Sequence, residues 1–228
     1  MKRVIRVLVP ATMFWIMGAD AQAAVTFSFE FDQPSYELAA GASVAVPVYL
    51  VESWTDSSLL TSVHGLATLG VEVTGTMPVR GTPGTISHVE ANTTDFDLLG
   101  VGQLLDTTNA SVLNSVDITQ ATLPDGPTGT AIDAHSSRIL AGVFKFTATG
   151  SPGDTATFQA MVMAGDASVA TWDSFNASLD NPELSIDYLD AMITSSYVEF
   201  TIVPEPTTGI LCAAGVFGLT VRRIRRRI

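Results

Sequence analysis

The chain has little cysteine and few basic residues. Its only cysteine is Cys212, close to the C-terminus, so residues 24–203 contain no thiol. A segment without cysteine forms no disulfide and offers no thiolate for a metal or for nucleophilic catalysis, so its stability depends on a packed core. Of 11 Lys and Arg residues, eight lie in the two terminal segments, which leaves Arg80, Arg138 and Lys145 between them.

Acidic residues, in contrast, are abundant between the two ends of the chain. Of 23 Asp and Glu residues, 21 lie within residues 24–203, which gives this segment a formal charge of −18. Such a surface repels nucleic acid and anionic lipid, so neither is expected as a partner. It attracts cations and cationic polymers, and it also helps to keep an exported protein in solution.

Long apolar runs are confined to the two ends. At the N-terminus, Lys2, Arg3 and Arg6 precede an apolar run that extends to about Ala19, and small residues follow at 21–23. This order is typical of a secretory signal peptide, here 1–23, cleaved after Ala23. The remaining 24–203 has the length of one exported domain with a substantial core.

The C-terminal apolar run is shorter than an ordinary membrane span. It covers residues 209–221 without a charge, whereas a helix needs about 20 residues to cross a bilayer. Positive charges directly after the run hold the C-terminus on the cytoplasmic side and stop translocation. These charges are Arg222, Arg223, Arg225, Arg226 and Arg227. We therefore expect a short transmembrane helix that holds the chain in the membrane before processing.

A proline-rich motif stands just before this helix. Val203 is followed by Pro204, Glu205 and Pro206, and two prolines in three residues keep the chain extended and accessible. The motif, the short apolar run and the final arginines, within 204–228, resemble a PEP-CTERM sorting signal. The resemblance implies removal of the tail by exosortase, a membrane-embedded transpeptidase-like protease. It also implies an inner-membrane intermediate and a final place at the surface or in the exopolysaccharide matrix of a Gram-negative-type bacterium. The alternative is a plain tail anchor with a proline-rich linker.

The body consists of short segments with alternating apolar and polar residues. This pattern, with turn residues between the segments and no helical period, predicts an all-β fold, an antiparallel β-sandwich. Clear strands are expected at 25–32, 43–51, 64–74, 138–149, 155–163 and 196–203, and weaker ones at 36–39, 85–91 and 109–122. We expect residues 138–163 to form a hairpin, residues 53–62 a loop, Pro47 an edge position or a bulge, and Gly70 a bulge.

Two of these segments resemble a known family. Residues 41–50 (GASVAVPVYL) are similar to the start of a cohesin-type module, and residues 140–146 (LAGVFKF) with Gly153-Asp154-Thr155 are similar to its C-terminal strands. The resemblance implies an Ig-like or cohesin-like jelly roll that docks proteins or adheres to glycans. It assigns no individual binding residue.

Residues for chemistry are few. No catalytic set is identified: His64, His88 and His135 lie in no metal motif, and no nucleophile elbow is present. Calcium is the one ion with candidate ligands, because extracellular oxygen-rich loops bind it; they are Asp180, Asn181, Glu183, Asp187 and Asp190. Trp54 and Trp172 are candidates for stacking on sugar, although tryptophans at such positions more often plug the end of a sandwich.

The sequence thus predicts a non-enzymatic, exported protein without an obligatory cofactor. Its first expected role is a structural or adhesive component of an extracellular polymer, with exosortase, surface polysaccharide or a surface protein as partners. The alternatives are a glycan- or protein-binding module assisted by calcium and, with less support, an extracellular hydrolase.

Overall fold

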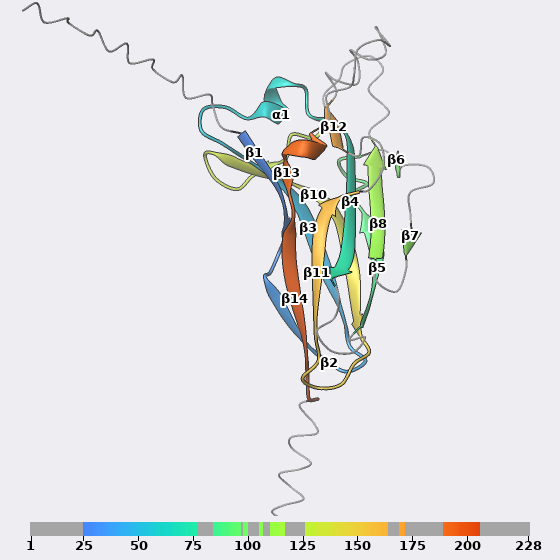
Figure 1. Cartoon of the computed structure of the whole chain (residues 1–228). Helices are drawn as coiled ribbons and strands as arrows, with labels where there is room; N and C mark the ends of the chain where they lie inside the picture. The colour runs from blue at the N-terminus through green and yellow to red at the C-terminus, as the bar shows by residue number, and fades with distance from the viewer. Residues whose placement is uncertain are drawn as a thin grey trace, which may run out of the picture.

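Two β-sheets make up most of the part of the protein that is described (Figure 1). The computed structural model describes residues 25–76, 84–96, 98–99, 105–106, 110–116, 126–163, 169–171 and 189–205. The predicted signal peptide and the predicted C-terminal helix at 209–221 lie outside these ranges. Within them, no helix is long and apolar enough to cross a membrane.

The first sheet, sheet A, has β3 and β10 in its interior. Its order is β13 (Ile193–Thr194), β1 (Val25–Phe31), β3 (Ser43–Trp54), β10 (Ser136–Ala148) and β5 (Gly84–Ala91), and β9 (Thr130–Ala131) pairs with β10. The expected alternation sets the inner face: Phe27 and Phe29 in β1 and Val46, Val48 and Leu50 in β3 are buried.

The second sheet, sheet B, contains the last strand of the domain. Its order is β2 (Ser35–Ala39), β14 (Ser196–Val203), β11 (Thr155–Val162), β4 (Leu66–Thr76), β8 (Ala110–Val116) and β6 (Leu98–Leu99). In addition, β12 (Val169–Thr171) pairs with β4, and β7 (Leu105–Asp106) pairs with β8. Alternate residues of β4, β11 and β14 point inward and meet the inner face of sheet A in one apolar core.

The two ends of the domain run side by side and change sheet together. β1 and β13 pair in parallel in sheet A, and β2 and β14 pair in parallel in sheet B. The chain therefore crosses between the sheets twice at the same edge, at residues 32–34 and at Ser195. All other pairs are antiparallel within the described residues. The parallel pairs tie the start of the domain to its end.

The hairpin predicted for residues 138–163 is wrong. Both strands exist, but β10 lies in sheet A and β11 in sheet B, where β11 pairs with β14 and β4. The turn between them crosses from one sheet to the other: Ala148 bonds Gly41 and Ala42, whereas Gly153 donates to the carbonyl of Ile202 at 2.7 Å. The local turn residues were identified correctly, but they do not show which strand the chain pairs with next.

Pro47 is not at a sheet edge, because β3 lies between β1 and β10. The Pro47 carbonyl accepts from the Asp32 N–H at 3.3 Å, so the ring nitrogen points to the same side, just past the end of β1. Proline has no N–H, and at this position no strand residue of β1 is left to accept a backbone hydrogen bond from it. The register shift in this region belongs to the partner strand β10, between Leu140 and Gly142.

Two further local predictions differ from the structure. Gly70 is in regular register with Asn114, and the irregularity of β4 lies instead opposite Ala170 and Thr171. The segment expected as a loop at 53–62 begins with the end of β3 and ends with a one-turn helix, α1 (Leu59–Ser62). A 3-10 turn, η1 (Asp190–Met192), precedes β13. Residues 36–39, 85–91 and 110–116 form strands as predicted.

Candidate functional site

The last described strand ends directly before the proline-rich motif. β14 ends at Val203, opposite Ala39 of β2, and Pro204 and Glu205 are exposed and outside any strand. Proline offers no N–H, so the ladder cannot continue through Pro204. Pro206 lies outside the described residues, as do the five arginines from Arg222 to Arg227. The backbone therefore becomes accessible within one residue of the last strand.

The exit of the tail is held firmly. β14 is an inner strand of sheet B, paired with β2 on one side and β11 on the other. Its end is also bonded to the turn after β10, since Ile202 donates to Asp154 at 2.9 Å and accepts from Gly153. We call this end of the sandwich, with residues 40–42, 150–154 and 202–205, the tail pole.

The opposite end holds the irregular loops. We call it the loop pole and define it by residues 54–65, including α1, and residues 126–135. Figure 1 shows α1 at one end of the molecule and the end of β14 at the other. The start of the domain also lies at the loop pole, because Val25 pairs with Trp54. A protein held by its C-terminal tail would therefore present the loop pole outward.

The loop pole is fixed by a carboxylate that the sequence did not single out. Glu52 is only 1% exposed and accepts three hydrogen bonds, from Ser58 Oγ at 2.7 Å, Leu59 N at 2.5 Å and Leu60 N at 3.0 Å. It thereby satisfies free N–H groups at the start of α1. Its only sequence cue was a break in the alternation, because an acidic residue occupies an inward position of β3.

The same pole contains tight backbone packing. His64 and Gly65 both have positive φ, 59° and 77°, and the Gly65 N–H donates to Leu60 O at 2.7 Å, which closes α1. Gly126 donates to His64 O at 2.8 Å, so residues 126–127 lie against this turn. A Cβ on Gly65 would stand 2.1 Å from Gly126 O. Only glycine fits at this position.

The candidate sugar-stacking residues are only partly described. Trp54 is half-buried at the last position of β3, and its backbone N–H donates to the His135 carbonyl at 2.9 Å. Trp172 lies outside the described residues. The half-buried Trp54 therefore offers only part of its surface at the loop pole.

The candidate calcium ligands are likewise only partly described. Asp190 is half-buried and accepts from the Val169 N–H at 2.8 Å, which joins η1 to β12. Asp180, Asn181, Glu183 and Asp187 lie outside the described residues. Among the residues that are described, no group of three or more His, Cys, Asp or Glu side chains is placed to hold a metal ion.

The histidines lie in two regions of the fold. His88 lies in β5, paired with Phe144, whereas His64 and His135 lie in loops of the loop pole. His135 is exposed, and its backbone N–H bonds the Asp133 carboxylate at 2.7 Å. This bond lowers the pKa of Asp133 below its usual value.

The comparisons with known proteins identify no relative. No protein-family model matches the chain, and a search of curated proteins returns no match.

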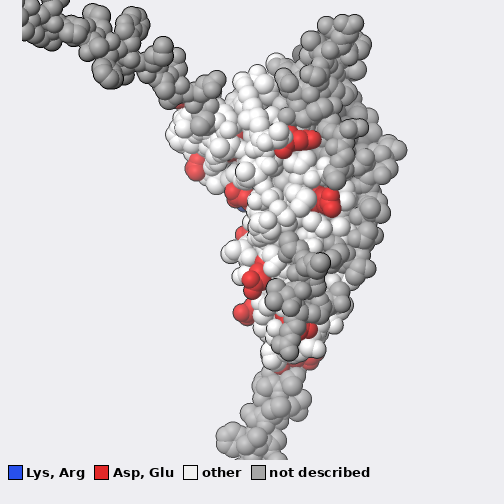
Figure 2. Space-filling view, in the orientation of Figure 1, with Lys and Arg blue, Asp and Glu red and all other residues white. Residues whose placement is uncertain are grey.

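The two outer faces of the sandwich differ in charge. Face A comprises the residues of β1, β3 and β10 that point away from the core, and it includes both described basic residues, Arg138 and Lys145, which are exposed. Face B comprises the outward residues of β2, β14, β11 and β4. It includes Glu37, Glu72 and Glu199 and, among the described residues, no Lys or Arg. Figure 2 shows several acidic side chains and almost no basic ones in its view.

Proposed function

We propose that this protein is an exported, non-enzymatic component of the cell surface or extracellular matrix, which an exosortase-type protease releases from its C-terminal tail. The observation that carries the proposal is the position of Val203. The last strand ends there, and the exposed Pro204 follows at once. Cleavage anywhere after Val203 would leave every described strand intact, so loss of the tail is compatible with a folded product.

The position of the two poles supports display at a surface. The tail pole is the membrane-facing end before processing, and the loop pole is the end directed outward. Loops at the free end of a rigid scaffold are the usual place for contacts with partners. With a charge of −18 on residues 24–203, the protein is repelled by anionic lipid and stands off the membrane.

We further propose a jelly-roll sandwich of the cohesin-like kind as the finer description of the fold. The two segments with that resemblance, residues 41–50 and 140–146, lie side by side as the inner strands β3 and β10, with Leu140 opposite Tyr49 and Phe146 opposite Val44. A calcium-assisted glycan module has less support, because Trp54 is half-buried and Asp190 is bonded to a backbone amide.

The processing proposal is tested with two epitopes, one after Ala24 and one after Ile228, in a host that has an exosortase. We expect the exported product to keep the first epitope and to lose the second. Substituting Pro204, Glu205 and Pro206 together by alanine should keep both epitopes on one membrane-bound chain. Substituting Pro152 by alanine is the control, because this exposed proline lies in the turn at the tail pole. An exported product with both epitopes would contradict the proposal.

A further inference from the structure

The two described basic residues form an unusual pair in so acidic a protein. Arg138 and Lys145 point outward from the same strand, β10, and within the described part of the chain neither is paired with a carboxylate. The Arg138 guanidinium instead lies 4.5 Å from the centroid of the Tyr49 ring. Face A therefore presents two positive charges without a carboxylate in direct contact, and the exposed acid next to them on this side of sheet A is Glu90 of β5, opposite Val143.

Between these charges, face A is largely apolar. Pro47, Tyr49, Leu140 and Val143 point outward there and are half-buried. Glu30 is the acidic residue at the β1 side, opposite Tyr49 in the register. An apolar centre between charged positions is typical of a protein interface.

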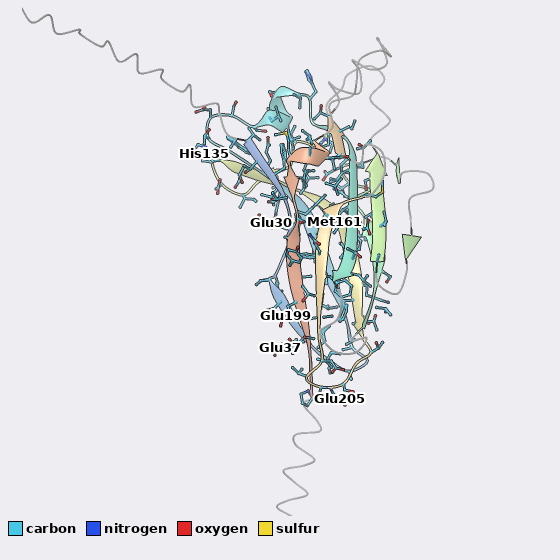
Figure 3. All side chains as sticks on the ribbon, in the orientation of Figure 1. Glu30, Glu37, His135, Met161, Glu199 and Glu205 are labelled. Atoms are coloured by element: carbon cyan, nitrogen blue, oxygen red, sulfur yellow. The ribbon has the colours of Figure 1, made fainter. Side chains whose placement is uncertain are left out.

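Face B of the same chain has the complementary character. Glu37 and Glu199 are exposed on the same face of the neighbouring strands β2 and β14. Glu199 pairs with Ser35 and Glu37 pairs with Thr201, so the two carboxylates are offset by two residues along the strands. Figure 3 shows them following one another toward Glu205. Glu72 lies farther along, on β4. Between them is Tyr197, which is 56% exposed, one of the most exposed large hydrophobic residues in the described part of the chain.

The charges on the two faces also have similar spacing along the strands. Arg138 pairs with Val51 and Lys145 with Ala45, so the cations lie six β3 residues apart, or about 20 Å. On face B, Glu37 is level with Thr155 of β11, because both pair with Thr201 of β14. Glu72 pairs with Met161 of β11. Thr155 and Met161 are six residues apart, so the two acidic positions are also separated by about 20 Å along the strands.

We infer that face A of one copy docks on face B of a second copy. This inference rests on the proposed structural role and specifies its partner. The contact joins two different surfaces, so each copy keeps one free face and the assembly grows as an open row. Tyr197 meets the apolar centre of face A, while the Glu37–Glu199 pair and Glu72 meet the cations.

The direction of growth suits a layer at the cell surface. Rows grow perpendicular to the sheets, whereas β14 runs along them from the loop pole to the tail pole (Figure 1). Copies stacked in the same sense therefore direct all their tails to one side. The net charge of −18 on residues 24–203 makes two copies repel each other at long distances. Salt at about 0.15 M screens this repulsion beyond about 8 Å, whereas charged pairs in direct contact at the interface are screened much less.

The test uses the full chain in neutral detergent at about 0.15 M NaCl, with the size of the protein measured by analytical ultracentrifugation over a range of concentrations. Arg138→Gln/Lys145→Gln should raise the concentration needed for association at least about tenfold, because the charged pairs orient the contact. Thr61→Glu/Ala134→Glu is the control, since it changes the net charge equally at exposed sites of the loop pole and should leave association unchanged.

Charge reversal identifies the two faces. Arg138→Glu/Lys145→Glu and Glu37→Lys/Glu72→Lys/Glu199→Lys should each prevent self-association, because like charges then meet. A mixture of the two variants should assemble again, since each supplies the face that matches the other. The rescue also shows that both variants are folded.

Three outcomes would overturn the inference. The unaltered chain could remain monomeric at all concentrations, or it could associate equally in every variant, which would place the contact outside faces A and B. Alternatively, face A could bind polygalacturonate, a polyanionic polysaccharide, in a manner sensitive to Arg138→Glu/Lys145→Glu while copies stay apart. Since the unprocessed chain is used, none of these results depends on whether the tail is cleaved in cells.

Discussion

The two poles of the sandwich are held by different forces. In the core next to the tail pole, Phe200 stacks on Phe146 with ring centroids 4.0 Å apart and on Tyr36 at 5.3 Å, and Phe158 meets it edge-on. At the loop pole, the carboxylate of Glu52 and backbone hydrogen bonds hold irregular chain. The aromatic cluster belongs to the common core, whereas the polar contacts act on one loop.

This difference indicates how each pole can open. An element bound into the core separates only when the whole domain unfolds, whereas a loop held by a few hydrogen bonds can open locally. The tail pole thus gives the C-terminal segment a fixed exit. The loop pole can adjust its outward surface without loss of the sheets.

Phe200→Ala should have the largest effect, because it weakens the core that supports the tail pole. The side chain is 0% exposed and lies between Tyr36, Phe146 and Phe158, so its loss leaves a cavity worth about 3 to 5 kcal/mol of unfolding free energy. Chemical denaturation measures this cost. Because the cluster belongs to the core, hydrogen exchange should speed up throughout both sheets. Faster exchange limited to β14 would contradict the proposed coupling.

Glu52→Ala should loosen the loop pole with a smaller global effect. It leaves Ser58 and the amides of Leu59 and Leu60 without their acceptor, at a cost of about 2 to 3 kcal/mol. We expect the amides of residues 59–63 to exchange much faster while the core strands change little. Glu52→Gln keeps an acceptor oxygen and should restore most of the protection. Uniform loss of protection in both sheets would show that the two poles do not differ.

Gly65→Ala and Gly153→Ala compare the same substitution at the two poles. Both glycines have positive φ, but a Cβ on Gly65 would strike Gly126 O, whereas nothing lies within 4 Å of one on Gly153. Gly65→Ala should therefore cost about 2 kcal/mol or more, and Gly153→Ala only about 1 kcal/mol. Thermal unfolding of the two variants measures the difference. Equal costs would argue against the close packing of residues 64–66 on 126–127.

Tyr36→Phe should lower the free energy of unfolding least of these substitutions at neutral pH. At alkaline pH it should change how stability depends on pH. The Tyr36 hydroxyl donates to Asp32, and losing this bond costs about 1 kcal/mol. Burial, and then the Asp32 carboxylate, raise the pKa of Tyr36 far above its usual value. Its contribution to stability is therefore present below about pH 10 and is lost as the pH rises further, because the unfolded chain ionises first. The unaltered protein should lose more stability than Tyr36→Phe above about pH 10, and parallel curves would contradict this.

The sequence predicted the strands better than their partners. Alternation located β1, β3, β4, β10, β11 and β14, because each buries one face. The pairing of β10 with β3 and of β11 with β14 depends on long-range packing, which local turn residues at 150–154 do not encode. The sheet changes at Asp32 and Ser195 were missed for the same reason.

The site was predictable only where a motif is local. The strand expected at 196–203 ends at Val203, and the exposed Pro204 and Glu205 follow it directly, whereas the role of the motif in sorting stays a prediction. Glu52 was overlooked because its role depends on amides that only the folded loop brings to it. The complementary charges on the two faces could not be predicted from the sequence, because they depend on which strands are neighbours. Only the strand pairing in the fold places Arg138 and Lys145 on one face and Glu37 and Glu199 on the other.

The central claim is best tested by the intact mass of the protein recovered from outside its native cells. We predict a chain that begins after Ala23 and ends between Pro204 and Thr208, alone or with an attached glycan or lipid. Such a mass would confirm that the domain is released just past its last strand. A mass that still includes Arg222 to Ile228 would contradict the account and leave an ordinary membrane anchor.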